Sequence, residues 1–264
     1  MMLLKILILG LVQGLTEFLP ISSTGHMIIV EHFLQLSDAF RETFFTVIQL
    51  GSILAVILYF RKKLLPMEAL LLPPARKKWF WLWVRIMVGV IPSLVIGALW
   101  GSDIQERLYS VQTVAIALFI GGVALVLLEH FKRKSTTDGI ENLSWWQLIG
   151  IGCAQCVAMI PGVSRSAATI LGALGLGASR ETAVEYSFFL AIPTMFAATG
   201  YSLLKHGASL SGTEWGYTAL GLAVAFVSSW SVIAFLMSFI RKRDFQVFGY
   251  YRIVLGLILF FTLR

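Results

Sequence analysis

The chain has 264 residues, of which 58% are hydrophobic and only 13% are charged, and its net charge is +7. A soluble domain usually carries about 25% charged residues, so the composition excludes an ordinary soluble protein. The basic residues cluster in short loops between apolar runs, which favours lipid headgroups and not nucleic acid as their partners. We therefore expect one all-α integral membrane domain over residues 1–264.

The first apolar stretch, Met1–Leu36, is interrupted at Pro20 and by the polar residues that follow it. Each half is too short to cross a bilayer, since a crossing takes about 17–25 residues. Non-helical backbone survives at membrane depth only where protein or a wet cavity satisfies its polar groups. The pattern therefore predicts a re-entrant helix–turn–helix hairpin.

Three runs of spanning length follow, and then a second interrupted stretch, Trp145–Gly177, which breaks at Pro161-Gly162. We interpret this stretch as a second re-entrant hairpin. Three more spanning runs complete the chain. The six predicted transmembrane helices are Thr43–Phe60, Leu82–Trp100, Val111–Glu129, Ala183–Leu204, Trp215–Ile240 and Val247–Phe261.

Basic loops orient these helices, because loops rich in Lys and Arg stay on the cytoplasmic side. Such loops follow the first, third and fifth spans, whereas the loops after the second and fourth spans are poorer in basic residues. The first hairpin is then expected to enter the membrane from outside and the second from inside. The basic clusters are Arg61-Lys62-Lys63, Arg76-Lys77-Lys78, Lys132-Arg133-Lys134 and Arg241-Lys242-Arg243.

A weak internal repeat relates the two halves of the chain, about 1–130 and about 141–264. Each half holds one hairpin and three spans, and an odd number of spans inverts one half relative to the other. Inverted repeats with broken helices place their site near the bilayer midplane, at the repeat interface. The matching positions are Gln13 with Gln155, Pro20 with Pro161, Ser22-Ser23 with Ser164-Arg165, and Arg41-Glu42-Thr43 with Arg180-Glu181-Thr182.

Polar residues inside the hairpins mark a candidate site, because ionisable groups are expensive at membrane depth. In the first hairpin Glu17 follows Gln13 by four residues, so both side chains lie on one helix face. Hydroxyl groups and a histidine come just past the break. These candidates are Ser22, Ser23, Thr24 and His26.

In the second hairpin Arg165 lies at the turn, between two serines. A helix is expected after each turn, His26–Leu36 and Ala167–Gly177, and the free N–H groups at its start favour an anion. The planar guanidinium fork of arginine suits phosphate. A carboxylate, a histidine, hydroxyl groups and an arginine in one pocket predict phosphoryl transfer and not simple binding.

The predicted nucleophile is Ser23, assisted by His26, while Arg165 and the helix starts hold the phosphates. Glu17 either binds a metal ion or orients His26, and His26 is an alternative nucleophile. The structural alternatives are a salt bridge between the two charged residues and helix caps for the hydroxyl groups. The predicted substrate-binding residues are Gln13, Ser22, Thr24, Ser164, Ser166 and Thr169.

The same residues carry a resemblance to a known family. The segment Gln13-Gly-Leu-Thr-Glu17-Phe-Leu-Pro-Ile-Ser-Ser-Thr-Gly-His26 resembles the first signature of the undecaprenyl-diphosphatases, the bacitracin-resistance family. The segment Pro161-Gly-Val-Ser-Arg-Ser166-Ala-Ala-Thr169 resembles the second signature. The similarity extends over essentially the whole chain, including Val47-Ile-Gln-Leu-Gly-Ser-Ile-Leu54.

This resemblance implies an enzyme that removes the terminal phosphate from undecaprenyl diphosphate and so recycles the lipid carrier for cell-wall glycans. It implies dependence on a divalent cation, Mg²⁺ or Ca²⁺, with Glu17 as a ligand. It also implies a bacterial inner-membrane protein whose active site opens toward the periplasm, with a homodimer as a candidate assembly. The family's roles carry over to Glu17, Ser23, His26 and Arg165.

The chain departs from the family pattern at two positions. The first motif often begins with Glu where this chain has Gln13, and the second usually reads Ser-Gly where it has Ser166-Ala167. The first departure leaves one carboxylate for a metal ion. The competing hypothesis is a polyprenyl-phosphate transporter without hydrolysis, which the inverted repeat favours by architecture, whereas serine and histidine beside arginine favour the enzyme.

Overall fold

The computed structural model describes residues 1–67, 72–131, 135–206 and 210–262. Its described part is helical apart from turns and one isolated bridge, between Thr137 and Ala178, which confirms the predicted all-α class. The basic cluster 132–134 lies outside the described residues. In chain order the helices are α1 (Met2–Thr16), α2 (Ser23–Leu34), α3 (Asp38–Tyr59), α4 (Arg61–Leu64), α5 (Pro73–Leu108), α6 (Val111–His130), η2 (Ile140–Asn142), α7 (Trp145–Cys156), η3 (Val157–Met159), α8 (Arg165–Gly175), α9 (Arg180–His206), α10 (Gly212–Phe239) and α11 (Gln246–Thr262).

Within the described residues, five helices are long and apolar enough to cross a membrane, namely α3, α5, α6, α9 and α10. They coincide with five of the six predicted spans to within a few residues, except that α5 is much longer than expected. The basic residues 76–78 belong to the first turns of α5 and not to a loop, since Pro73 is well tolerated at a helix start. The sixth predicted span is α11, which has 17 residues and stands at the short end of the spanning range. The chain is therefore a multi-pass membrane protein.

Both interrupted stretches fold as pairs of short helices, α1 with α2 and α7 with α8. The second helix of each pair begins earlier than the sequence predicted, at Ser23 and at Arg165. The reason is a serine cap: Ser22 Oγ accepts a hydrogen bond from the Gly25 amide at 3.3 Å, and Ser164 Oγ accepts one from the Ala167 amide at 3.2 Å. Capping places the candidate nucleophile and the candidate anion-binding arginine at the first position of a helix.

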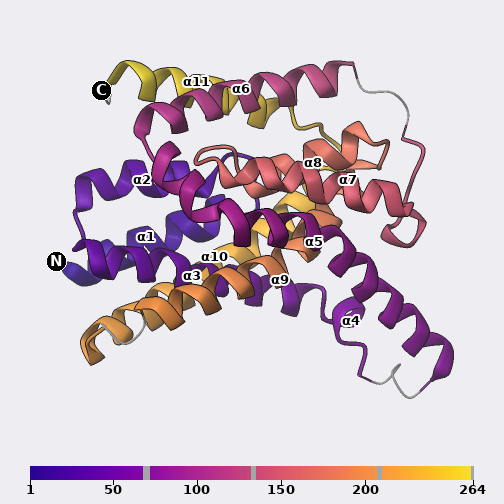
Figure 1. Ribbon diagram of the computed structural model, residues 1–264, viewed down its shortest axis with the longest axis horizontal. Coiled ribbons are helices and arrows are strands. Elements are labelled where there is room, and N and C mark those ends of the chain that lie inside the picture. Colours follow the sequence, from indigo (N-terminus) through magenta and orange to yellow (C-terminus); the bar gives the residue numbers. More distant parts are fainter. Residues whose placement is uncertain (68–71, 132–134, 207–209, 263–264) are drawn as a thin grey trace.

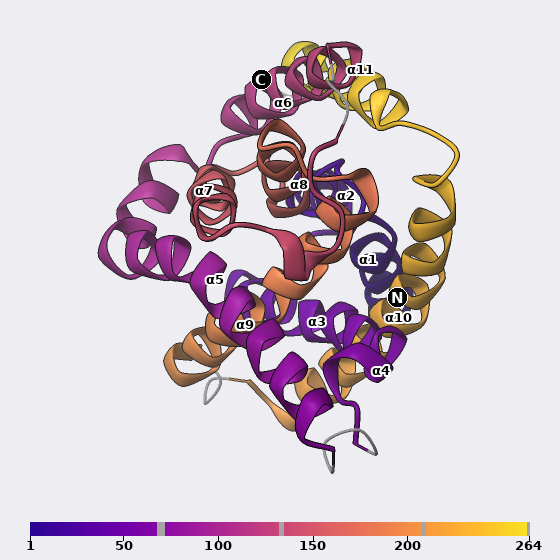
Figure 2. The same ribbon diagram turned by 90° about the vertical axis from the view of Figure 1, so that its right-hand side faces the viewer.

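The hairpins lie inside the helix bundle. Helix α6 packs along α11, and the pair forms one edge of the molecule in Figure 1. Helices α2 and α8 lie between that pair and the group formed by α3, α9 and α10 (Figures 1 and 2). Much of the buried apolar core surrounds α9, whose Tyr186, Phe188 and Phe189 are fully buried. The two hairpin turns thus meet in the interior of the protein.

The first helix of each hairpin is held by a long helix from the other half of the chain. Helix α1 packs on α10 where Gly10 lies against the backbone oxygen of Gly221, and α7 packs on α5 where Gly152 lies against the backbone oxygen of Gly89. A methyl group at Gly10 or Gly152 would overlap those oxygens. Small residues let membrane helices approach this closely. The glycine contacts therefore determine how each hairpin is positioned against the long helix that holds it.

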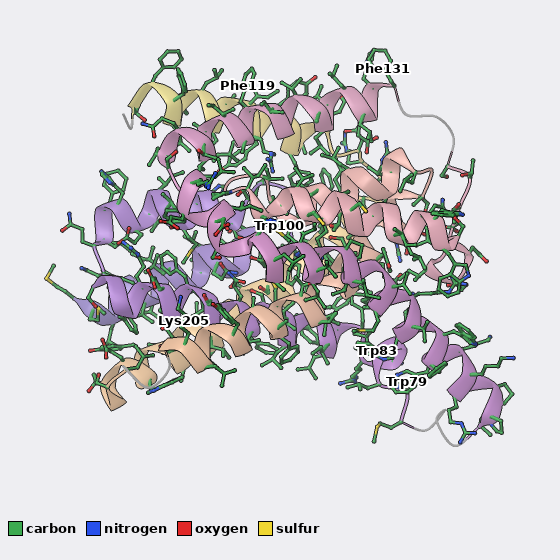
Figure 3. The ribbon with its side chains drawn as sticks, viewed as in Figure 1. Trp79, Trp83, Trp100, Phe119, Phe131 and Lys205 are labelled. Atoms are coloured by element: carbon green, nitrogen blue, oxygen red, sulfur yellow. The ribbon has the colours of Figure 1, made fainter. Side chains whose placement is uncertain are left out.

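The outer surface of the bundle is apolar. Phe119 and Phe131 project from α6 away from the rest of the molecule (Figure 3) and are 38% and 72% exposed. Tryptophans gather near the start of α5, where the Trp79 indole donates to the Leu64 carbonyl at 2.7 Å. An exposed surface of this kind is suited to contact with lipid.

Candidate functional site

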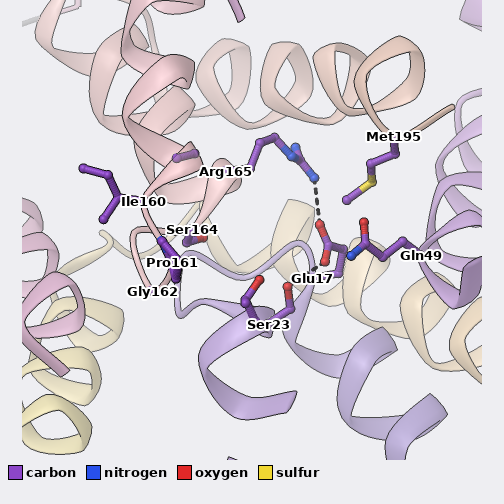
Figure 4. Close-up of a pocket in the computed structure, with 11 residues that line it drawn as sticks. Glu17, Ser23, Gln49, Ile160, Pro161, Gly162, Ser164, Arg165 and Met195 are labelled. Carbon is purple, nitrogen blue, oxygen red and sulfur yellow. Dashed lines mark hydrogen bonds and ion pairs between the residues drawn. The ribbon is translucent and has the colours of Figure 1, made fainter. Parts of the chain in front are cut away.

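A cavity of about 110 Å³ lies where the two hairpin turns meet (Figure 4). Both hairpins line it, together with Gln49 from α3 and Met195 from α9. Its other polar lining residues are Glu17, Ser23, Thr24, Ser164 and Arg165. Residues from sequence positions far apart thus form one small polar space inside an apolar bundle.

Each turn enters its helix through a strained serine. Ser22 has φ 71° and Ser164 has φ 74°, in the left-handed region that residues other than glycine seldom adopt. Such conformations cost on the order of 1–3 kcal/mol and cluster at functional sites, where the surrounding contacts hold them. Each strained serine is followed by the first residue of a helix, Ser23 or Arg165, which lines the cavity, and the start of a helix favours an anion.

Glu17 connects the two hairpins through its carboxylate. Its Oε2 accepts hydrogen bonds from Gln13 Nε2 at 2.9 Å and from Ser23 Oγ at 2.7 Å. Its Oε1 pairs with Arg165 Nη2 at 3.1 Å, and only 4% of the Glu17 side chain is exposed. The serine hydroxyl therefore points its proton at a carboxylate, as the hydroxyl of an activated nucleophile does.

Arg165 reaches this carboxylate from the second hairpin (Figure 4). Its Nη1 donates to the Ser187 carbonyl at 2.8 Å, so the two ends of the guanidinium fork are fixed on different elements. Its Nε is buried and has no hydrogen-bond partner among the described residues. A buried donor without a partner is costly, so this nitrogen adds to the cost of holding the guanidinium at the edge of the cavity.

The remaining predicted substrate-binding residues divide into two groups. Thr24 and Ser164 line the cavity, and Gln13 acts on it through Glu17. Ser22, Ser166 and Thr169 are buried and hold the turns instead of lining the space. Ser166 Oγ donates to the Leu19 carbonyl at 3.0 Å, which joins the hairpins, and Thr169 Oγ1 donates to Ser187 Oγ at 2.7 Å.

His26 lies on the other side of the first turn and is not among the residues that line the cavity. Its Nδ1 is 2.7 Å from the Ser22 carbonyl oxygen, and its Nε2 is 2.6 Å from the Tyr251 hydroxyl on α11. The ring of His26 thus contacts Ser22 and Tyr251 and not the expected Ser23, whereas Ser23 contacts Glu17 directly.

Two residues of this region escaped the sequence analysis. Arg252 on α11 is fully buried and donates to the carbonyl oxygens of Pro20 and Gly162 at 3.3 and 3.2 Å, so it ties the two turns together. The signal was a lone arginine inside the predicted span Val247–Phe261, which is unexpected in an apolar helix. Gln49 lines the cavity, and its signal was an amide in the middle of a predicted span.

A metal ion fits this site only in part. Among the described residues, no group of three or more His, Cys, Asp or Glu side chains could hold one. The cavity offers one carboxylate, Glu17, with amide and hydroxyl oxygens beside it. Mg²⁺ is often bound by one or two carboxylates together with substrate phosphates, so the residues fit a cation that Glu17 shares with a phosphate ligand.

The arrangement combines a hydroxyl that donates to a carboxylate, a guanidinium fixed beside the cavity, and the starts of two helices. In-line phosphoryl transfer depends mostly on positioning and on neutralisation of charge. Each of these features supplies either positioning or neutralisation of charge. The geometry of the site therefore suits attack on a phosphate group.

Comparisons with known proteins agree on one family. A family model described as "Bacitracin resistance protein BacA" matches residues 6–258. "Undecaprenyl-diphosphatase 1" of Clostridioides difficile (strain 630) is 47% identical over 256 residues, which cover 96% of this chain and 93% of that protein. "Undecaprenyl-diphosphatase" of Enterococcus faecalis is 45% identical over 97% of this chain and 95% of its own length. The protein of the same name from Acetivibrio thermocellus is 46% identical over 97% of this chain and 96% of its own.

Proposed function

Because the chain belongs to the bacitracin resistance protein BacA family, we propose that it hydrolyses undecaprenyl diphosphate to undecaprenyl phosphate and inorganic phosphate. The names of its full-length relatives support this substrate. The observation that carries the proposal is the hydrogen bond from Ser23 to a carboxylate that is itself paired with Arg165. The reaction would recycle the lipid carrier of cell-wall glycans and confer bacitracin resistance.

In the first step Arg165 and the two helix starts hold the terminal phosphate. Ser23 Oγ attacks its phosphorus while the hydroxyl proton passes to Glu17 Oε2. The bond from phosphorus to the bridging oxygen breaks, and undecaprenyl phosphate departs with that oxygen and the proton from Glu17. Charge neutralisation by a fixed guanidinium stabilises the transition state, because it needs no reorganisation during the reaction.

In the second step a water molecule attacks the phosphorus bound to Ser23 and gives a proton to Glu17. The bond between phosphorus and Ser23 Oγ breaks, Oγ regains the proton, and inorganic phosphate leaves. His26 as the nucleophile is less well supported, because both of its ring nitrogens already have hydrogen-bond partners. A divalent cation, if bound, would be held by Glu17 and would neutralise charge on the substrate.

We further propose six spans and two re-entrant hairpins in an inverted repeat, in the bacterial inner membrane with the site open to the periplasm. The matched serine turns and the two glycine contacts between halves support the repeat. Cysteines placed near Lys77 should be labelled from the cytoplasm and ones near Asp103 from outside. Labelling of both from one side would exclude the topology. The counterpart positions Arg133 and Ser209 lie outside the described residues, and a homodimer stays a prediction.

The decisive test of function is phosphate release from undecaprenyl diphosphate by the purified protein. Ser23→Ala is the matched control, because it removes one hydroxyl and leaves Glu17 and Arg165 in place. We expect release by the wild-type protein and a loss on the order of a hundredfold or more in the variant. A wild-type protein that binds the lipid and releases no phosphate would favour the transporter hypothesis instead.

A further inference from the structure

His26 is the motif residue that the proposed mechanism leaves without a chemical step. Its ring lies between the first turn and α11, with Nδ1 2.7 Å from the Ser22 carbonyl and Nε2 2.6 Å from the Tyr251 hydroxyl. The imidazole and phenol rings are parallel within 5°, with centroids 5.6 Å apart. Two hydrogen bonds and a ring contact therefore hold the side chain from both ends.

These contacts determine which nitrogen carries the proton. A carbonyl oxygen only accepts, so Nδ1 must carry hydrogen to bond Ser22. Nε2 of the neutral ring is then an acceptor, and the Tyr251 hydroxyl donates to it. In the other tautomer the lone pair of Nδ1 would face the carbonyl oxygen, which is repulsive. Tyr251 thus stabilises the tautomer that lets His26 bond Ser22.

The Ser22 carbonyl connects His26 to the turn that presents Ser23. It accepts from the His26 ring and also from the His26 backbone amide, at 3.2 Å. Ser22 itself holds the left-handed conformation that directs the chain into α2, and Ser23 is the next residue. A second hydrogen bond on this carbonyl offsets the cost of the strained turn. The turn in its strained form is what presents Ser23 Oγ to Glu17 at 2.7 Å (Figure 4).

We propose that Tyr251 and His26 are positioning residues for the nucleophile: the Tyr251 hydroxyl fixes the His26 tautomer, and the His26 Nδ1–H group clamps the Ser22 turn that presents Ser23. The proposal deepens the proposed function and rests on it. It gives His26 a task outside the cavity, which its side chain does not line. A misplacement of about 1 Å of a reacting group costs on the order of a hundredfold in rate, so the clamp acts on kcat and not on KM.

Replacing His26 by asparagine or by glutamine, whose side-chain amides differ in length, tests the hydrogen bond to the Ser22 carbonyl. The amide nitrogen of asparagine falls near the Nδ1 position of histidine, whereas that of glutamine falls near Nε2. His26→Asn therefore keeps a donor for the Ser22 carbonyl and has no proton to exchange near neutral pH. We expect kcat of His26→Asn to stay within about tenfold of wild type, and His26→Gln and His26→Ala to lose on the order of a hundredfold. KM should stay within about twofold in all three.

A second pair of variants tests the role of Tyr251. Tyr251→Phe removes one hydroxyl and keeps the ring, and it should lower kcat about three- to tenfold, the rate equivalent of one neutral hydrogen bond. Tyr250→Phe is the matched control on the same helix, and it should leave kcat unchanged. In a His26→Asn background Tyr251→Phe should cause no further loss, because the amide has no tautomer to fix.

The tautomer is also measured without turnover, by ¹⁵N NMR of protein labelled in histidine, with the His26 signals assigned by their loss in His26→Asn. A proton on Nδ1 in the wild type, and mixed tautomers in Tyr251→Phe, are expected. Equal losses in His26→Asn and His26→Gln would overturn the clamp, since they indicate chemistry at the ring. A wild-type proton on Nε2 would also overturn it. Absence of phosphate release with the expected tautomer would instead count against the proposed function alone.

Discussion

The two hairpin turns share one backbone design and carry different chemistry. In both, a glutamine on the first helix precedes the capping serine by nine residues, and that serine has a left-handed φ, 71° for Ser22 and 74° for Ser164. The next residue is the first of a helix at the cavity. It is Ser23 in one turn and Arg165 in the other. A symmetric frame therefore presents a nucleophile from one side and a cation from the other.

The surrounding residues differ in a way that follows from these two side chains. Four residues after the glutamine the first hairpin has Glu17 and the second Met159, so only the first turn supplies an anion. Four residues after the serine the first has His26 and the second Ala168. A short hydroxyl must be held closely to reach its partner, whereas a long guanidinium spans the gap itself. The first turn therefore needs a second contact that holds its backbone, and the second turn does not.

The largest expected effect comes from removing the cation of the second turn. Arg165→Ala should lower phosphate release on the order of a hundredfold or more, because the terminal phosphate loses its clamp. Arg165→Lys should be nearly as inactive, since lysine keeps the charge and loses the fork that contacts Glu17 and Ser187 together. Rates are measured on purified, folded protein. Near-normal turnover of the alanine variant would make Arg165 a structural residue.

Removing the anion of the first turn should be almost as severe. Glu17→Gln cannot take the Ser23 proton, so we expect activity to fall on the order of a hundredfold. It also leaves Arg165 buried without its partner, and breaking such a pair costs about 3–5 kcal/mol of stability. A double variant, Glu17→Gln with Arg165→Met, separates the two effects.

The double variant should unfold at a temperature close to that of the wild type, because no charge is left unpaired, and should stay inactive. Thermal melting in one detergent, beside the phosphate assay, measures both. Recovery of activity in the double variant would mean that the pair is structural and that the chemistry lies elsewhere.

Much of this site was predictable from the sequence, because the hairpin interruptions and the intramembrane charges are local signals. Pro20 and Pro161 predicted the breaks, and Glu17 and Arg165 stood out as ionisable residues in apolar surroundings. The helix starts were predicted wrongly, at His26 and Ala167, because the positive φ of the capping serine leaves no distinctive pattern in sequence, although helix caps were among the alternatives for the hydroxyl residues. Local sequence signals thus predict where helices break and which residues are exceptional, but they do not predict which residues contact one another across the fold.

Partners across the fold were the part that sequence reasoning missed. Tyr251 lies 225 positions from His26, and Arg252 lies 232 positions from Pro20, so only the packing of α11 brings these two residues to the first turn. His26 was placed beside Ser23 because the two are close in sequence. In the structure the two side chains have different partners, because Ser23 donates to Glu17 while His26 contacts Tyr251 on α11.

A smaller effect is expected at Gln13, which donates to Glu17 and is buried. Gln13→Ala should lower activity only partly, about three- to tenfold, since Glu17 keeps two other donors. Gln13→Glu should stay active and reach half-maximal rate at lower Mg²⁺ or Ca²⁺, because a second carboxylate strengthens a site for hard cations. A metal titration of both variants beside wild type measures this. If Gln13→Glu required more metal, Glu17 would not be the residue that meets the cation.

The smallest effect is expected at the matching glutamine of the second hairpin. Gln155 Nε2 donates to Ser93 Oγ at 2.6 Å and to Thr194 Oγ1 at 3.3 Å, while its buried Oε1 has no partner among the described residues. Gln155→Leu loses two hydrogen bonds and also removes an unsatisfied acceptor, so stability should change by no more than about 1 kcal/mol. Turnover should stay within about twofold of wild type, since Met159 gives this glutamine no carboxylate to orient. The phosphate assay and thermal melting of Gln155→Leu beside Gln13→Ala decide the matter. A loss of turnover equal to that of Gln13→Ala would mean that both glutamines serve the reaction, and the division of labour between the two turns would be wrong.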